Sequence, residues 1–550
     1  MQRRTLCLQW MLLVAILVCG GQASGHDHTR HAAQRARAVA LAKSRGLAEP
    51  VTNADLQTTC RLTINLVDAE TQAALAGLVR ITDVASGKAI SLSGEIHRAL
   101  NWYSLEQRSQ ITVPRGQLKI EAVRGLCTEL AIVELDLQEQ AEAQVTIPLT
   151  TFSRPSQQGF FSGNTHLHLM NLTHAEADRY LRVVPRGDDL DLVFLSHLRR
   201  IPDERDYISN VIVENSFTGG DLQRLSQDGV LFANGEEHRH NFGPGGEGYG
   251  HVMLLDLLRL IRPVSIGPGI MAEGTDGLPL RRGIQQARAD GATVIWCHNT
   301  FGMEDVPNWM DGLLHAQNIF DGGLHGSYRD SFYRYLNLGL RVPFSTGTDW
   351  FIYDFARVYV PVAPEWTAKD WLASLRAGQS YITNGPLLQF EANGAAIGST
   401  LPLSGPRQIQ IQGTAQGRVD FRGLELIHNG EVIATVESTA QGNHFQARLE
   451  HTLDVREPGW VALRIPLENA KTELDRTLFA HTSPIYMNVA GKRPFRRDIA
   501  QQLIEETEAS MKVIQQKGTF ANQQERARVL DVYRSGIRNL RNRIAEQAGQ

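Results

Sequence analysis

The stretch LDLVFLSH, residues 190–197, is an apolar run that ends in a histidine. Short apolar runs bounded by turn residues predict buried strands. Runs of the same form recur as DGVLFANG, residues 228–235, ATVIWCHN, residues 292–299, and LRVPFSTG, residues 340–347. Helical segments are expected between them, at residues 279–290 and 330–338, each followed by glycine. Alternating strands and helices predict an α/β unit with a parallel sheet or barrel over residues 155–385.

The segments on both sides of this unit have a different pattern. Residues 56–150 and 386–492 alternate apolar and polar side chains over short runs with turn residues between them, which predicts two β sandwiches. The first resembles the carboxypeptidase-regulatory or transthyretin-like sandwiches that occur beside exported enzymes. Residues 493–550 carry an apolar helical stripe and predict a helical tail, split near Gly518. This tail has two alternative arrangements: a hairpin packed on the enzyme body, or a short coiled coil that forms an oligomer.

The amino terminus indicates export. Two arginines precede the apolar run from Trp10 to Val18, and small residues follow it. This pattern predicts a signal peptide over residues 1–23, followed by a polar helical leader over residues 24–55. The run is too short for a membrane-spanning helix, so no integral anchor is expected. Lipid attachment at Cys19 is the less favoured alternative.

Composition excludes several classes of protein. At 550 residues the chain predicts about three or four folded units of roughly 150 residues each. Its net charge of −4, with 42% apolar and 21% charged residues, is ordinary for a globular protein and gives no nucleic-acid-binding footprint. For the exported protein we expect a disulfide between Cys60 and Cys127, with Cys297 as a free, buried thiol.

Histidines gather at the predicted strand ends of the α/β unit. Ten of the 18 histidines lie between residues 166 and 325. In a parallel α/β barrel the carboxyl ends of the strands meet at one rim, and imidazole and carboxylate side chains suit zinc, manganese or iron. The candidates are His166, His168, His174, His197, Glu237, His251, His298 and Asp349. Four histidines without a strand-end position are expected in loops or behind the ligands: His238, His240, His315 and His325.

The order of these motifs is similar to the metal motifs of the PHP (polymerase and histidinol phosphatase) superfamily. The motifs are GNTHLHL, LSHL, GEE, GYGH, WCHN and TGTD, and the segments SLRAGQSYITNGPLLQFEANG and AHTSPIYMNVAGK resemble the CehA/McbA branch of metallohydrolases. The resemblance implies a PHP-type distorted (β/α) barrel flanked by the two sandwiches.

The resemblance also assigns ligands residue by residue. It implies that His166, His168 and Asp349 bind a first divalent ion, and that Glu237 bridges to a second ion held by His251 and His298. His174 and His197 match ligands of a third site. That site is in doubt because Phe351 stands where the family often has a histidine, and Asn299 or Asp354 stays open as a substitute ligand.

The expected function is hydrolysis of a small-molecule ester-type bond. Two cations that share a carboxylate activate a water at neutral pH; Glu237 would bridge them, and His197 or His174 would protonate the leaving group. The bond could be a carboxyl ester, a carbamate or a phosphoester, and a phosphoesterase is the first alternative. A non-catalytic surface-binding protein on a degenerate barrel is the second. A serine hydrolase is disfavoured, since the sequence contains no Gly-x-Ser-x-Gly elbow.

Overall fold

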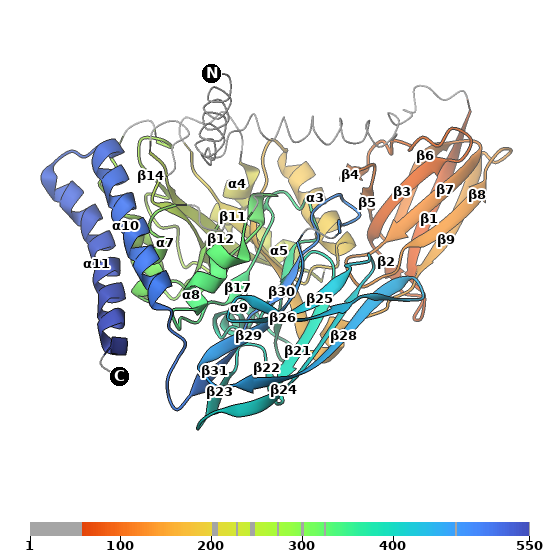
Figure 1. Cartoon of the computed structure of the whole chain (residues 1–550). Helices are drawn as coiled ribbons and strands as arrows, with labels where there is room; N and C mark the ends of the chain where they lie inside the picture. The colour runs from red at the N-terminus through yellow and green to blue at the C-terminus, as the bar shows by residue number, and fades with distance from the viewer. Residues whose placement is uncertain are drawn as a thin grey trace, which may run out of the picture.

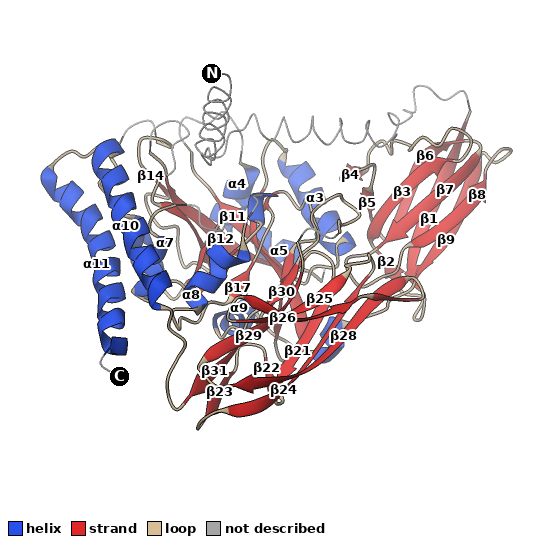
Figure 2. Ribbon diagram, in the orientation of Figure 1, coloured by secondary structure: helices blue, strands red, loops and turns tan. Residues whose placement is uncertain are grey.

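The computed structural model describes residues 58–548, apart from residues 201–206, 227–228, 243–247, 272–273, 299–301, 324–325 and 468–469. The predicted signal peptide and leader and the alternative lipidation at Cys19 lie outside this part of the chain. Within it, the chain is a mixed α/β structure built mostly of strands, with a helical tail at its carboxyl end (Figures 1 and 2). Over the described residues, no helix combines the length and apolar character that membrane crossing requires.

Two sheets form the amino-terminal unit, at the right of Figure 1. One is four-stranded, with β1 at its centre, and the other runs β4-β5-β3-β7-β8. Side chains at alternate positions of both sheets meet in one core, as the period-two pattern predicts. The transthyretin-like character stays a prediction. The strands are β1 (Thr59–Asp68), β2 (Ala74–Leu75), β3 (Gly77–Asp83), β4 (Ile96–His97), β5 (Tyr103–Leu105), β6 (Arg108–Pro114), β7 (Gln117–Val123), β8 (Ala131–Asp136) and β9 (Glu142–Leu149).

The central unit is a sheet that curls into a half-barrel, with helices packed on it. Its predicted strands and the helices expected at residues 279–290 and 330–338 are present. The elements are η2 (Pro155–Gln158), β10 (Phe160–His168), α3 (His174–Gly187), β11 (Leu192–His197), α4 (Ile208–Ser216), α5 (Asp221–Leu225), β12 (Leu231–His240), β13 (Gly250–Leu255), β14 (Ser265–Ile266), α6 (Leu280–Ala289), β15 (Thr293–Trp296), α7 (Asp305–Met310), β16 (Ala316–Asn318), η4 (Asp321–Gly323), η5 (Arg329–Tyr333), α8 (Arg334–Leu336), β17 (Phe344–Ser345), β18 (Asp349–Trp350), β19 (Arg357–Pro361), α9 (Ala368–Arg376) and β20 (Tyr381–Thr383).

Strand β10 lies at the centre of this curl. It pairs in parallel with β11 on one side and with β18 on the other, and β11 pairs in parallel with β12. Strand β13 then runs antiparallel between β12 and β15. Because β10, β11 and β18 run the same way, residues at their carboxyl ends come to one edge of the sheet.

The carboxyl-terminal strands extend the same sheet and add a second one. Strands β23, β25, β26, β29, β30 and β31 continue the half-barrel sheet through the β20–β30 pairing, and β22-β21-β24-β28-β27 form a separate five-stranded sheet. The strands are β21 (Leu387–Ala392), β22 (Ala395–Ala396), β23 (Thr400–Leu403), β24 (Arg407–Gly417), β25 (Gly423–His428), β26 (Glu431–Glu437), β27 (Thr439–Gln441), β28 (His444–Val455), β29 (Gly459–Ile465), β30 (Ala480–Thr482) and β31 (Ile485–Val489).

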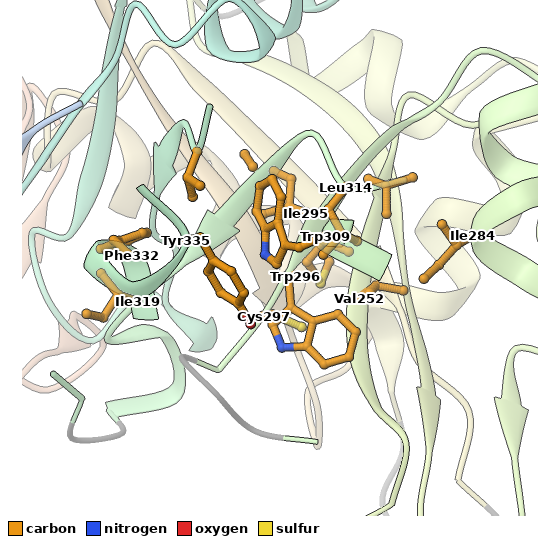
Figure 3. Packing of buried hydrophobic residues seen from close by; sticks show 14 of the residues in the cluster. Val252, Ile284, Ile295, Trp296, Cys297, Trp309, Leu314, Ile319, Phe332 and Tyr335 are labelled. Atoms are coloured by element: carbon orange, nitrogen blue, oxygen red, sulfur yellow. The ribbon is translucent and has the colours of Figure 1, made fainter. Parts of the chain in front are cut away.

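The tail is a hairpin of α10 (Arg497–Lys517) and α11 (Gln523–Ala548), as predicted. The stripe residues Leu530, Tyr533, Ile537 and Leu540 are buried and belong to the same core as the half-barrel. Figure 3 shows part of this core around β15, where Ile295, Trp296 and Cys297 lie among buried residues of neighbouring elements. The tail therefore packs on the body of the protein.

The predicted disulfide is wrong. Cys60 and Cys127 are free thiols, and Cys297 is free and buried as expected. Cys60 lies in the core between the two amino-terminal sheets. Cys127, by contrast, belongs to the core that the carboxyl-terminal strands build. The two cysteines share a β-rich stretch of sequence, but their side chains point into different cores.

Candidate metal centre

Six of the eight predicted ligands come together at one edge of the half-barrel. All six side chains are buried, with at most 1% exposure. Their ligand atoms form two groups, in each of which the atoms lie within 4.8 Å of one another: His166, His168, Glu237 and Asp349, and Glu237, His251 and His298. Glu237 is common to both groups, so the arrangement suits two cations that share one carboxylate.

The first group is contributed by β10, by β18 beside it and by β12, which lies one strand further along the sheet. His166 and His168 are two residues apart on one strand and project to the same side. Their Nε2 atoms are 3.0 Å apart. Glu237 Oε2 lies 3.2 Å from His168 Nε2, and Asp349 Oδ1 lies 3.3 Å from His166 Nε2. Two imidazole nitrogens and two carboxylate oxygens therefore face a common point.

The second group surrounds the other oxygen of Glu237. His251 Nδ1 lies 3.0 Å and His298 Nε2 3.3 Å from Glu237 Oε1. Arg239, two residues along β12, places its guanidinium 3.5 Å from Glu237 Oε2. Burial opposes ionisation of Glu237, but Arg239 and the surrounding histidines hold the pKa of Glu237 well below its ordinary value. Arg239 is a functional candidate that the sequence reasoning missed.

The hydrogen bonds behind the rings decide which nitrogen carries the proton. His168 Nδ1 lies 2.9 Å from the Ser196 carbonyl, which can only accept a hydrogen bond. His166 Nδ1 lies 2.9 Å from a carboxylate oxygen of Asp321. Each Nδ1 is therefore the donor, and the neutral form of each ring presents a bare lone pair at Nε2. The first group then consists of acceptors alone, and a cation between them removes their mutual repulsion.

Asp349 supports the same conclusion. Neither of its carboxylate oxygens accepts a hydrogen bond from a described residue, although the side chain is only 1% exposed. Burial, with the neighbouring carboxylates Glu237 and Asp321, raises the pKa of Asp349 well above its ordinary value. A buried carboxylate without donors is costly unless it binds a cation. The residues therefore fit a divalent metal.

The backbone is strained where it delivers the ligands. His298 and Asp349 have φ of 63° and 60°, in the left-handed region that residues with a Cβ seldom adopt. Such conformations concentrate at functional sites, where surrounding packing fixes them. Here they allow side chains beyond the ends of β15 and at β18 to turn toward Glu237.

Asp321 is a second residue that the sequence reasoning missed. It follows β16, which has only three residues and gives a weak apolar signal in AQNIFDGG. Its carboxylate is fully buried and contacts the Nδ1 atoms of both His166 and His298, at 2.9 and 3.4 Å. Burial opposes the charged form of His298, but Cys297 and Asp321 raise the pKa of His298 well above its ordinary value. The position after a strand end was the available clue.

His174 and His197, the predicted ligands of a third metal, form no ligand group among the described residues. His174 begins α3, is about half exposed and lies 3.3 Å from Asp221. His197 ends β11, is buried, and its Nε2 lies 3.1 Å from Glu214 Oε1. Each imidazole is paired with a carboxylate instead of with the other.

The substitute ligands considered for the third site do not complete it within the described chain. Phe351 packs against Tyr180. Asp354 accepts hydrogen bonds from Asn384 and from the Phe355 amide. Asn299 lies outside the described residues. Within the described chain, the predicted ligands are therefore gathered into two overlapping groups, each of which could hold a metal ion.

His238 and His240 were expected in loops or behind the ligands, and the structure excludes the loop position for both. Strand β12 continues to His240, so both side chains are buried within the sheet. His238 pairs with Glu236, whose side chain points to the opposite face of the strand from Glu237. His240 lies 2.9 Å from Asp276. His315 is hydrogen-bonded by the Val294 amide, and His325 lies outside the described residues.

Cys297 Sγ also lies near this site, grouped with His166, His298 and Asp321. Burial raises the pKa of the Cys297 thiol to about 12. With no ion bound, Cys297 is therefore a neutral thiol at neutral pH, and a cation bound nearby would favour its thiolate.

Comparison with known proteins gives no match to any family model, any curated protein or any solved structure.

Proposed function

We propose that this chain is an exported hydrolase that uses two divalent metal ions, zinc, manganese or iron, to cleave an ester-type bond in a small molecule. The observation that carries the proposal is the acceptor-only cluster: two bare imidazole nitrogens and two carboxylate oxygens, all from buried side chains, within 4.8 Å of one another. The order of the six ligands along the chain supports a PHP-type barrel for the half-barrel sheet, with β sandwiches on both sides.

Each ligand has a stated place in this proposal. His166, His168 and Asp349 would hold the first ion, His251 and His298 the second, and Glu237 would bridge them. When bound, such a pair of ions lowers the pKa of a water and supplies hydroxide at neutral pH. Arg239 keeps Glu237 ionised, so the bridging carboxylate stays available for both ions.

His197 is the proposed proton carrier. Glu214 lies beside its Nε2, which makes Nε2 the donor and leaves Nδ1 as the lone pair. Burial lowers the pKa of His197 to about 4, so the ring is neutral at pH 7. It would accept a proton from the attacking water and return it to the leaving group. His174, half exposed and paired with Asp221, has no part in this step.

The proposal is tested by metal content and turnover of the full chain. Elemental analysis of purified protein should find two divalent ions for each chain. His166→Ala and Asp349→Ala should each lose metal and reduce hydrolysis of aryl esters, aryl carbamates and phosphate esters by at least about a hundredfold. Glu236→Gln changes a buried carboxylate on the other face of β12 and should leave both measurements unchanged.

The outcomes separate the competing functions. A preference for phosphate esters would assign the protein to the phosphoesterases. Metal binding without turnover of any of these substrates would favour the non-catalytic binding protein. Wild-type protein that takes up no divalent ion would refute the metal centre altogether.

A further inference from the structure

We propose that Asp321 is a positioning residue that holds the ligands of both metal ions at once, without itself binding either ion. This inference rests on the metal centre proposed above. It assigns one carboxylate, from a loop absent from the ligand motifs, to setting the geometry of His166 in the first group and His298 in the second.

The contacts of Asp321 divide between its two oxygens. Oδ2 lies 2.9 Å from His166 Nδ1 and accepts a hydrogen bond from Asn318 Nδ2 at 3.0 Å. Oδ1 accepts the backbone amide of His298 at 3.2 Å and lies 3.4 Å from His298 Nδ1. Both imidazoles therefore present Nδ1 to the same carboxylate and turn Nε2 toward the cluster.

The hydrogen bonds of the carboxylates distinguish positioning from ligation. A carboxylate has about four lone-pair sites; Asp321 takes part in three hydrogen bonds, with His166 Nδ1, Asn318 Nδ2 and the His298 amide, and lies 3.4 Å from His298 Nδ1. Asp349, on the other side of His166, accepts no hydrogen bond from a described residue. Asp349, whose oxygens accept no such hydrogen bond, is suited to bind a cation, while Asp321, whose oxygens are hydrogen-bonded, is suited to orient the histidines beside it.

Hydrogen bonds from neighbouring strands hold the segment that leads into Asp321. Asn318, which donates to Asp321, faces Thr165 Oγ1 at 3.3 Å, and Thr165 lies next to His166 on β10. The Ile319 amide donates to Ser345 at 3.1 Å, and Thr346 Oγ1 donates back to Ile319 at 2.6 Å. Asp321 is thus tied to β10 and β17, so its position is set before any ion binds.

One consequence separates this role from that of a ligand. Loss of a ligand removes one ion and leaves the other site largely intact. Loss of Asp321 frees a ring in each group, so the affinities for both ions should fall together while two ions still bind at saturation. Carboxylates that orient metal-binding histidines are typically worth 10- to 100-fold in metal affinity.

The experiment uses full-length protein stripped with a chelator and titrated with Zn²⁺ in competition with a chromophoric chelator. Asp321→Asn should still bind two ions for each chain, each about 10- to 100-fold more weakly. The absorption spectrum of the Co²⁺-loaded variant should also change shape. The control Glu236→Gln should match the wild type in both measurements.

Three results would overturn the inference. One is a fall to one ion for each chain with the remaining affinity unchanged, since that would make Asp321 a ligand. Another is an unchanged affinity for both ions. A third is a large drop in the melting temperature of the metal-free variant with zinc affinity preserved, because that would make the role purely structural. Wild-type protein that binds no Zn²⁺ would instead refute the metal centre itself.

If Asp321→Asn does not fold, Asn318→Ala tests the same contact more gently. It keeps the carboxylate and removes one of the groups that orient it, so both zinc affinities should fall by about fivefold. Unchanged affinities in that variant would overturn the inference.

Discussion

Gly322→Ala is the sharpest test of the site geometry. Gly322 follows Asp321 and has φ of 67°. A Cβ at this position would lie 2.7 Å from Asp349 Oδ2, whereas an ordinary contact begins near 3.4 Å. The methyl group therefore has to displace the Asp349 carboxylate by about 0.7 Å, well beyond the roughly 0.2 Å that metal–ligand distances tolerate.

Two separate effects are expected from this substitution. Alanine in the left-handed region costs about 1–2 kcal/mol of folding free energy. Displacement of Asp349 should in addition weaken zinc binding by about 10- to 100-fold, because the first group then loses its open carboxylate. The loss of folding free energy comes from the backbone conformation, and the loss of zinc affinity comes from the displaced Asp349 carboxylate.

Gly323→Ala is the matched control. Gly323 has φ of 68°, but among the described residues its Cβ would approach nothing closer than Tyr353 Oη at 3.7 Å. Urea unfolding of the metal-free proteins should give the two variants similar losses, and Zn²⁺ competition titration should show weakened binding for Gly322→Ala alone. Equal zinc affinities in the two variants would refute the placement of Asp349 as a ligand.

Three further predictions concern the rest of the molecule. Burial raises the pKa of Asp354 from 3.8 to about 6, so the folded protein binds this proton more tightly than the unfolded chain and its contribution to stability is lost as the pH rises from 4 to 6. In urea unfolding, the free energy of unfolding of Asp354→Asn should therefore rise by about 3 kcal/mol relative to that of the wild type between pH 4 and 7. A difference between the two proteins that does not change with pH would contradict the burial argument. Leu540 is fully buried in the tail, so Leu540→Ala should lower the free energy of unfolding by about 2–5 kcal/mol. A loss below about 1 kcal/mol would show that the tail is not part of the core. Because Cys60, Cys127 and Cys297 are free thiols, a millimolar dithiol should leave the melting temperature unchanged. A marked fall would show that the dithiol had reduced a stabilising disulfide.

Local pattern was enough to predict most of the elements. The strand that ends at His197 is a short apolar run, and the amino-terminal strands and the two tail helices have an apolar periodicity; both signals depend only on nearby residues. Strand β16 escaped prediction because three residues cannot show a period, and Asp321 was missed with it. The predicted strand ends at Gly235, whereas β12 continues to His240. The extension was missed for a related reason: its polar residues from Glu236 to His240 are buried and do not alternate with apolar ones.

The cysteine pairing failed for a different reason. A disulfide needs Cα atoms within about 7 Å, and no local pattern reports that distance. Cys60 is held in the core of its own two sheets, while Cys127 faces the core built by strands that come more than 200 residues later. Burial of both thiols was compatible with a bond and did not require one.

By itself, the sequence determined which side chains are available for metal chemistry, because strand ends and residue types are local properties. Only the tertiary structure decided how they are used. It turned the two Nε2 atoms of His166 and His168 toward Asp349, gave Asp321 three hydrogen-bond partners, and paired His174 and His197 with carboxylates of their own. The reason is physical: whether a buried carboxylate or imidazole binds a cation depends on the donors and acceptors around it, and these come from strands and loops far apart in the chain.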